Sequence, residues 1–223
     1  MWLFGRTWAK QRAVELREIR LKSLFKLINK ILRHDISGKL TTVRYGIETS
    51  EIEGNEGIDM AYQAAADGIE LVRQMKILEK LAAEDVDLQA VDVRGEIEVA
   101  AKSYSIPLYT HGNATVLADP ALRSVFENLI RNAVVHSGTD KIHVEINVRD
   151  GDVEVRVVDF GKGIPEKYRK TLFTEGGKFG ETGNTGLGLY IVKETIKRYG
   201  GSVRYEATKP HGATFVLTLK KAG

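Results

Sequence analysis

The fold of the C-terminal half is decided by the stretch Val157-Val-Asp159-Phe-Gly161-Lys-Gly163-Ile. Residues 142–148 and 153–158 alternate with period two around the turn Asp150-Gly151-Asp152, so the sequence predicts a β-hairpin that ends at Asp159. Glycines two and four residues later allow a flat ligand to approach the backbone closely. A carboxylate in that position can accept a hydrogen bond from an adenine amino group, although Asp-x-Gly is also a common plain turn.

A helix is predicted before this hairpin, from Pro120 to His136, with Asp119 as its N-cap. It contains the run Glu127-Asn128-Leu-Ile-Arg-Asn132-Ala133, in which Asn128 and Asn132 share one helix face. An amide oxygen is a hard ligand of the kind that Mg²⁺ accepts together with water and phosphate oxygens. The alternative is that the two asparagines line a solvated face.

After the hairpin, glycines lead directly into another predicted helix, in the run Gly183-Asn-Thr-Gly186-Leu-Gly188-Leu-Tyr-Ile. Helix N-termini bind phosphate through free N–H groups and the helix dipole. The glycine spacing matches neither the dinucleotide motif nor the P-loop. The polar, glycine-rich residues 172–182 before it are typical of a mobile lid.

The remaining pattern of residues 85–223 contains short strands at 106–109, 114–118, 202–205 and 214–219. Strands and helices mix without strict βα alternation, so we expect an α+β two-layer sandwich.

The N-terminal part, residues 1–84, has a different pattern. Apolar residues recur at steps of three and four over residues 12–53 and again over 58–83, with a glycine-rich turn at 54–57. Two antiparallel helices with one apolar stripe each cannot bury both stripes alone. We therefore expect a multidomain chain whose all-α helical hairpin pairs with a second copy into a four-helix bundle, which makes the protein a homodimer.

The bulk composition restricts the class of function. The chain has 223 residues with Lys+Arg 33 against Asp+Glu 30, a net charge of +3 that is too small to indicate nucleic-acid binding. The absence of cysteine excludes thiol catalysis and Cys-ligated zinc. No run approaches the roughly 20 apolar residues that cross a bilayer, so no membrane segment is expected in this chain.

Taken together, the motifs of residues 86–221 resemble the ATP-binding domain that histidine kinases share with type II topoisomerases, Hsp90 chaperones and MutL. The four boxes of histidine kinases occur in order, as Asn128/Asn132, Asp159/Gly161/Gly163, Phe173 and Gly186-Leu187-Gly188. The resemblance implies ATP and Mg²⁺ as cofactors. It implies that Asn132 holds Mg²⁺ and that Asn128 lies beside the phosphates. It further implies that Asp159 reads the adenine amino group, that Thr214 assists through water, and that the backbone from Thr185 to Gly188 cradles the phosphates.

The first helix contains Leu32-Arg-His34-Asp35, with His34 at the edge of the apolar stripe. A histidine there is often a packed boundary residue. His34-Asp35 nevertheless resembles the phosphoacceptor box of histidine kinases, which implies that the neutral imidazole attacks the γ-phosphorus while Asp35 acts as base. Members with phosphatase activity often carry Thr or Asn four residues after the histidine, where this chain has Gly38, so that activity is in doubt.

Asn128 stands where hydrolysing members of the superfamily carry a glutamate, and an amide cannot act as a general base. The expected function is therefore an ATP-dependent protein histidine kinase of a two-component system. It would phosphorylate His34 and pass the group to an aspartate of a response-regulator receiver domain, in the cytoplasm or as the cytoplasmic part of a membrane-bound sensor. Two alternatives stay open: a phosphotransfer scaffold with a degenerate ATP fold, and an ATPase of the chaperone or topoisomerase type.

Overall fold

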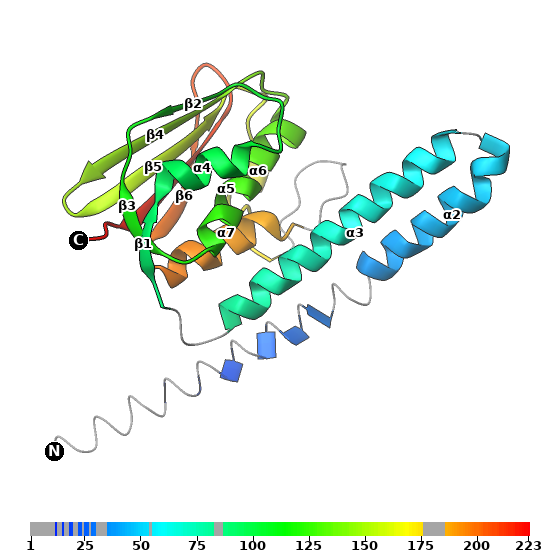
Figure 1. Cartoon of the computed structure of the whole chain (residues 1–223), viewed down its shortest axis with the longest axis horizontal. Helices are drawn as coiled ribbons and strands as arrows, with labels where there is room; N and C mark the ends of the chain where they lie inside the picture. Colours follow the sequence, from blue (N-terminus) through cyan, green and yellow to red (C-terminus); the bar gives the residue numbers. More distant parts are fainter. Residues whose placement is uncertain are drawn as a thin grey trace. The chain divides into compact units, whose positions relative to one another are not determined.

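A computed structural model describes residues 35–53, 55–82, 87–175 and 186–223, together with single positions and pairs between residues 12 and 29. The chain divides into two compact units, Met1–Glu84 and Asp85–Gly223, which are drawn in Figure 1. Each unit is considered by itself.

The first unit is a helical hairpin built from α2 (Ser37–Glu53) and α3 (Asn55–Ala82). The helices run antiparallel, because Lys39 on α2 forms an ion pair with Asp67 on α3 at 2.6 Å while Gly46 lies against Gly57 near the other end. A Cβ at Gly46 would lie 2.5 Å from the carbonyl oxygen of Gly57, so the close approach of the helices requires this glycine. Before α2, Asp35 and Ile36 form one wide helical turn.

The expected turn at residues 54–57 is too long, because α3 already begins at Asn55. Gly57 is buried in the first turn of α3, where its carbonyl oxygen lies against Gly46 of α2. The sequence pattern indicated that Gly57 forms a turn, whereas in the structure Gly57 belongs to α3 and contacts α2.

The second unit contains a five-stranded mixed sheet in the order β2-β4-β5-β7-β6. Its strands are β2 (Leu108–His111), β4 (Ile142–Arg149), β5 (Asp152–Asp159), β6 (Ser202–Ala207) and β7 (Ala213–Lys220). The pair β2–β4 is parallel and the other pairs are antiparallel. A separate small sheet pairs β1 (Gln89–Asp92) with β3 (Thr115–Ala118).

One face of the large sheet is covered by helices, which gives the two layers visible in Figure 1. These helices are α4 (Val93–Ala101), α5 (Ala121–Asn132), which continues as a π-helical turn over Ala133–Ser137, and α7 (Gly188–Arg198). A short helix, α6 (Glu166–Arg169), follows β5. Alternate residues of β4, β5 and β7 join the helices in one buried apolar core, as the period-two pattern predicts.

These features confirm the predicted helices with a mixed sheet in the C-terminal unit. The hairpin turn Asp150-Gly151 has φ +50° and +83°, values that suit the tight turn predicted there. Within the described ranges, no helix is long and apolar enough to cross a membrane.

Candidate functional site

Asp159 lies at the end of β5 and is 4% exposed. One carboxylate oxygen, Oδ1, accepts the backbone N–H of Gly161 at 3.0 Å and of Ala213 at 3.3 Å. Burial raises the pKa of Asp159, and the two backbone donors together with Ser137 oppose that rise. The carboxylate is thus held at a fixed position in a largely dry environment.

The loop after Asp159 passes very close to the end of the π-helical turn. A Cβ at Gly161 would lie 2.2 Å from the carbonyl oxygen of Ser137, and the N–H of Lys162 donates to that oxygen at 2.9 Å. On its other side the loop meets the β6–β7 connection: Gly163 has φ +68°, and a Cβ there would lie 2.8 Å from the carbonyl oxygen of Gly212. Glycines are therefore needed at both positions, one for space and one for space and backbone conformation.

The two asparagines of α5 share a face but have different surroundings. Asn128 is fully buried; its Nδ2 donates to the carbonyl oxygen of Ser124 at 2.8 Å and its Oδ1 accepts from Nη2 of Arg131 at 3.1 Å. Asn132 is half-buried at the last position of α5, and its side chain has no hydrogen-bond partner among the described residues. Asn128 is therefore committed to the protein, while the amide of Asn132 is available to a ligand.

The N-terminus of α7 lies directly beside Asn128. A Cβ at Gly188 would lie 2.8 Å from Oδ1 of Asn128, so glycine allows the two helices to meet. Gly186 has φ +67° and Leu187 is buried, which fixes how the chain enters α7. The first N–H groups of a helix have no partner within it, so this end can bind an anion. The structure thus brings Asn128 and the start of α7 together.

A family model described as histidine kinase-, DNA gyrase B- and HSP90-like ATPase matches residues 118–223, the part of the chain that carries this geometry. Over these residues the chain is similar to this family. The matched range contains the two asparagines, the Asp159 loop and the start of α7.

The curated proteins that the chain resembles are named as sensor or sensor-like histidine kinases. GraS of Staphylococcus haemolyticus is 27% identical over 231 residues, covering 96% of this chain and 66% of GraS. SenX3 of Mycolicibacterium smegmatis is 33% identical over 150 residues, covering 60% of this chain and 39% of SenX3. The chain therefore spans less than two thirds of the length of these curated relatives.

Solved structures support the same fold. The ATP-binding domain of PrrB from Mycobacterium tuberculosis is 27% identical, with a TM-score of 0.52 and coverage of 62% of this chain and 100% of that domain. The histidine kinase ThkA, solved in complex with the response regulator TrrA, is 19% identical, with a TM-score of 0.70 and coverage of 96% of this chain and 66% of ThkA. The second likeness concerns the fold alone.

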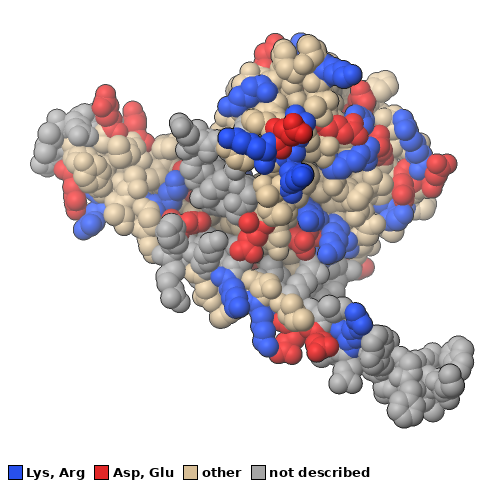
Figure 2. Space-filling view, turned by 180° about the vertical axis from the view of Figure 1, so that it is seen from behind, with Lys and Arg blue, Asp and Glu red and all other residues tan. Residues whose placement is uncertain are grey.

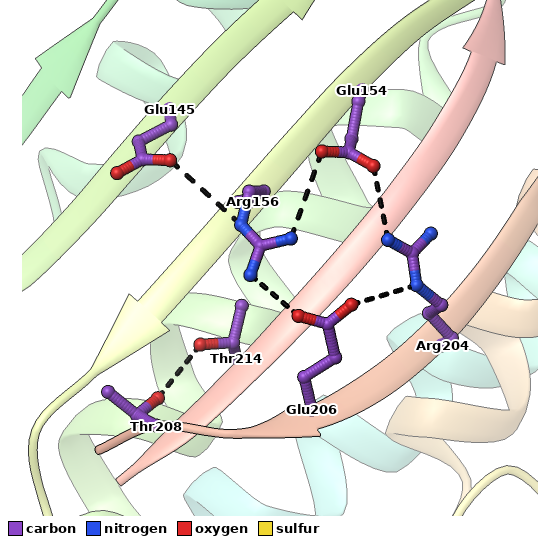
Figure 3. Close-up of polar contacts among 7 residues, drawn as sticks. All are labelled: Glu145, Glu154, Arg156, Arg204, Glu206, Thr208 and Thr214. Atoms are coloured by element: carbon purple, nitrogen blue, oxygen red, sulfur yellow. Dashed lines mark hydrogen bonds and ion pairs between the residues drawn. The ribbon is translucent and has the colours of Figure 1, made fainter. Parts of the chain in front are cut away.

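Thr214 does not lie beside Asp159 in the ATPase domain. Its hydroxyl is 2.8 Å from that of Thr208, on the sheet face that carries the ion pairs of Glu145, Glu154, Arg156, Arg204 and Glu206 (Figure 3). Asp159 points to the opposite, helix-covered face, as do the neighbours of Thr214 in β7, Ala213 and Phe215. In β7 the group that contacts Asp159 is the backbone N–H of Ala213, and period-two alternation places the Thr214 side chain on the other face of the sheet.

Phe173 contacts the core of the ATPase domain. Its ring meets Phe215 edge-on at a centroid distance of 6.2 Å, so the side chain packs against the apolar core. Thr185 and His34 lie outside the described residues. Asp35 is half-buried in the wide turn before α2.

Sequence reasoning missed two contributors to the site, Ser137 and Arg131. Ser137 follows His136 at the end of the helical pattern, and Gly138 with φ +71° marks that end. Gly138 indicated that the helix ends there. The contact of Ser137 with the Asp159 loop could not be predicted from this pattern, because the two segments are far apart in the sequence. Arg131 was visible only as one more charge on an amphipathic helix.

Basic and acidic side chains are interspersed over the described residues on the face shown in Figure 2. Charges of one sign do not gather into a broad patch on that face.

Replacing Gly161 by Ala should destabilise the ATPase domain by about 3 kcal/mol, because the new methyl group meets the Ser137 carbonyl oxygen, which belongs to the backbone. Gly151→Ala is the matched control: φ is +83° there but nothing lies within 4 Å, so strain alone should cost about 1 kcal/mol. Scanning calorimetry of the full chain should show a loss of roughly 10 °C for the first variant and 3 °C for the second. Equal losses would contradict the steric explanation.

Proposed function

We propose that this chain is the catalytic core of a sensor histidine kinase, which transfers the γ-phosphoryl group of ATP to its own His34 and then to an aspartate of a response-regulator receiver domain. The observation that carries the proposal is that α5 and its π-helical extension meet both other motifs: Asn128 lies beside the N-terminus of α7, and Ser137 lies beside the Asp159 loop, all within the residues that the ATPase family model matches. GraS, a sensor histidine kinase, and SenX3, a sensor-like histidine kinase, support the same activity.

Each element has a chemical role in nucleotide binding. Asp159 offers a fixed carboxylate oxygen to the adenine amino group, and the glycines at 161 and 163 let the base lie against the backbone. The first N–H groups of α7 face the phosphates. Asn132 supplies an amide oxygen to Mg²⁺, which neutralises phosphate charge when bound.

Transfer to an acceptor is favoured over hydrolysis by the state of Asn128. Its amide is fully buried and its Oδ1 and Nδ2 are both hydrogen-bonded within the protein. An amide in this state can neither take up a proton nor orient a water molecule as a base. The domain therefore holds ATP without activating water at this position.

The acceptor chemistry belongs to His34 and Asp35. The lone pair of the neutral imidazole attacks the γ-phosphorus, the bond from that phosphorus to the bridging oxygen breaks, and ADP leaves with the electron pair. Asp35 accepts the proton from the other ring nitrogen. In the second reaction an aspartate of the receiver domain takes the phosphoryl group and leaves the histidine neutral.

A homodimer follows from the apolar residues that the hairpin leaves uncovered. On α3 these residues recur at steps of four, seven and three, and on α2 they are seven apart: Ile58 (55% exposed), Tyr62 (77%), Ile69 (72%), Val72 (44%), Leu40 (64%) and Ile47 (61%). This spacing is that of a helix–helix seam. A second copy would cover both stripes in a four-helix bundle.

Ile69→Lys should therefore convert the dimer into monomers, since each dimer loses two buried isoleucines and acquires two buried charges. We expect the dissociation constant to rise by about 1,000-fold or more. Gln63→Lys introduces the same residue on α3 about 120° around the helix from position 69 and should leave the dimer intact. Sedimentation equilibrium measures both; a wild-type protein that is monomeric at all concentrations would refute the bundle.

The partner in the second step is a receiver domain, as in the complex of ThkA with TrrA. It would dock on the bundle near His34. Because ATP and receiver domains are found in the cytoplasm, the chain is expected to act there.

Incubation of the full chain with Mg²⁺ and ATP labelled at the γ-phosphate tests the proposal. We expect an acid-labile, alkali-stable phosphoprotein, because phosphohistidine has these properties. Release of free phosphate with no labelled protein would instead indicate an ATPase. Failure to bind nucleotide would indicate a scaffold with a degenerate ATP fold.

A further inference from the structure

A guanidinium group lies at the start of α7. Arg131 lies three residues after Asn128 on α5, so the two side chains are neighbours on the helix surface. Its Nη2 is 3.1 Å from Oδ1 of Asn128, and a Cβ at Gly188 would lie 3.4 Å from the same nitrogen. Arg131 thus reaches the N-terminus of the helix that is proposed to face the phosphates.

The end of α7 that Arg131 reaches carries positive partial charge of its own. The N-terminal end of a helix carries a partial positive charge, so a cation beside it is repelled. The first turn of α7 has no acidic residue to offset this charge. A second cation, Lys162, comes from the loop after Asp159. Burial lowers the pKa of His136, and the positive charges of Arg131 and Lys162 lower it further. Positive charge from two segments of the chain therefore acts on the π-helical extension of α5 at His136.

We infer that Arg131 binds the phosphate chain of ATP directly and so serves as a catalytic residue of the proposed kinase. The inference rests on the proposed function and adds a residue to its site. An anionic triphosphate at this place would be attracted both by the guanidinium and by the end of α7, and the planar guanidinium can donate two hydrogen bonds to phosphate oxygens. In the phosphoryl transfer it would stabilise charge that develops on the leaving ADP.

The test compares two ligands on the full chain. Mg–AMPPNP carries the phosphates and adenosine does not, so only the first should respond to Arg131. Arg131→Gln removes the charge while keeping an amide donor for Asn128. Arg131→Lys keeps the charge but removes the planar guanidinium group, which can donate two parallel hydrogen bonds. Arg123→Gln is the matched control, because Arg123 lies on the same helix but pairs with Glu96 at 2.8 Å.

By calorimetry, Arg131→Gln should weaken Mg–AMPPNP binding about tenfold or more, with partial recovery in Arg131→Lys. Adenosine affinity, from an NMR titration, should change less than twofold in every variant, and Arg123→Gln should match the wild type for both ligands. Equal weakening of adenosine and AMPPNP would show that Arg131 only supports the fold, and unchanged AMPPNP binding would overturn the inference while leaving the kinase proposal intact. If the wild type binds neither ligand, both the inference and the proposed function fail.

Discussion

His34→Gln is expected to abolish incorporation of label from γ-labelled ATP while Mg–AMPPNP binding stays within about twofold of wild type. Glutamine has a similar length but lacks a nucleophilic ring nitrogen, so no phosphoryl-nitrogen bond can form. Nucleotide binding should survive because the Asp159 loop, Asn132 and α7 all belong to the other compact unit. The measurement is radiolabel on the protein after alkaline work-up, alongside calorimetry.

His111→Gln is the matched control, because His111 is an exposed residue of the edge strand β2 and should keep full labelling. Persistent labelling of the His34 variant would refute the acceptor assignment. Asn132→Ala should also lose label, through weaker metal and nucleotide binding. Mixing the His34 and Asn132 variants then determines direction: label returns if one protomer phosphorylates its partner, and stays absent if transfer occurs within one protomer.

Asp159→Asn is expected to reduce ATP affinity by at least about 100-fold without lowering the stability of the unliganded protein. The new amide oxygen can still accept the N–H groups of Gly161 and Ala213. The other end of the asparagine amide is an NH₂ group, which would face the adenine amino group. Both groups are hydrogen-bond donors, so no hydrogen bond can form between them. A buried unmatched pair of this kind costs several kcal/mol.

The sign of the stability change follows from the raised pKa of Asp159. Because burial makes the folded state hold this proton more tightly than the unfolded state, folding loses stability as the pH rises from about 4 through the raised folded pKa. Asparagine has no charge to bury, so the variant should lose this pH dependence and melt at or above the wild-type temperature at pH 7. Asp152→Asn, at the exposed end of the same strand, should affect ATP affinity less than twofold. A large loss of melting temperature in Asp159→Asn would contradict this explanation.

Local sequence patterns predicted much of the site because they report on one element at a time. Period-two alternation placed Asp159 at the end of β5, and the i, i+4 spacing placed Asn128 and Asn132 on one face of α5. Helix α4 escaped prediction: its sequence VRGEIEVAA is rich in β-branched residues, and its helical start depends on the side chain of Asp92, which accepts the N–H of Gly95.

By itself the sequence determined the order of the motifs, the alternation of each strand and the apolar seams of the two helices, since these depend on neighbouring residues. Only the tertiary structure decided that Gly57 packs against α2, that Thr214 turns away from Asp159, and that Arg131 stands beside Gly188. Such contacts join residues that sheet order and helix packing bring together from distant parts of the chain. The physical reason is that periodicity tells which face of an element is buried, whereas the identity of what it is buried against is set by the packing of the whole unit.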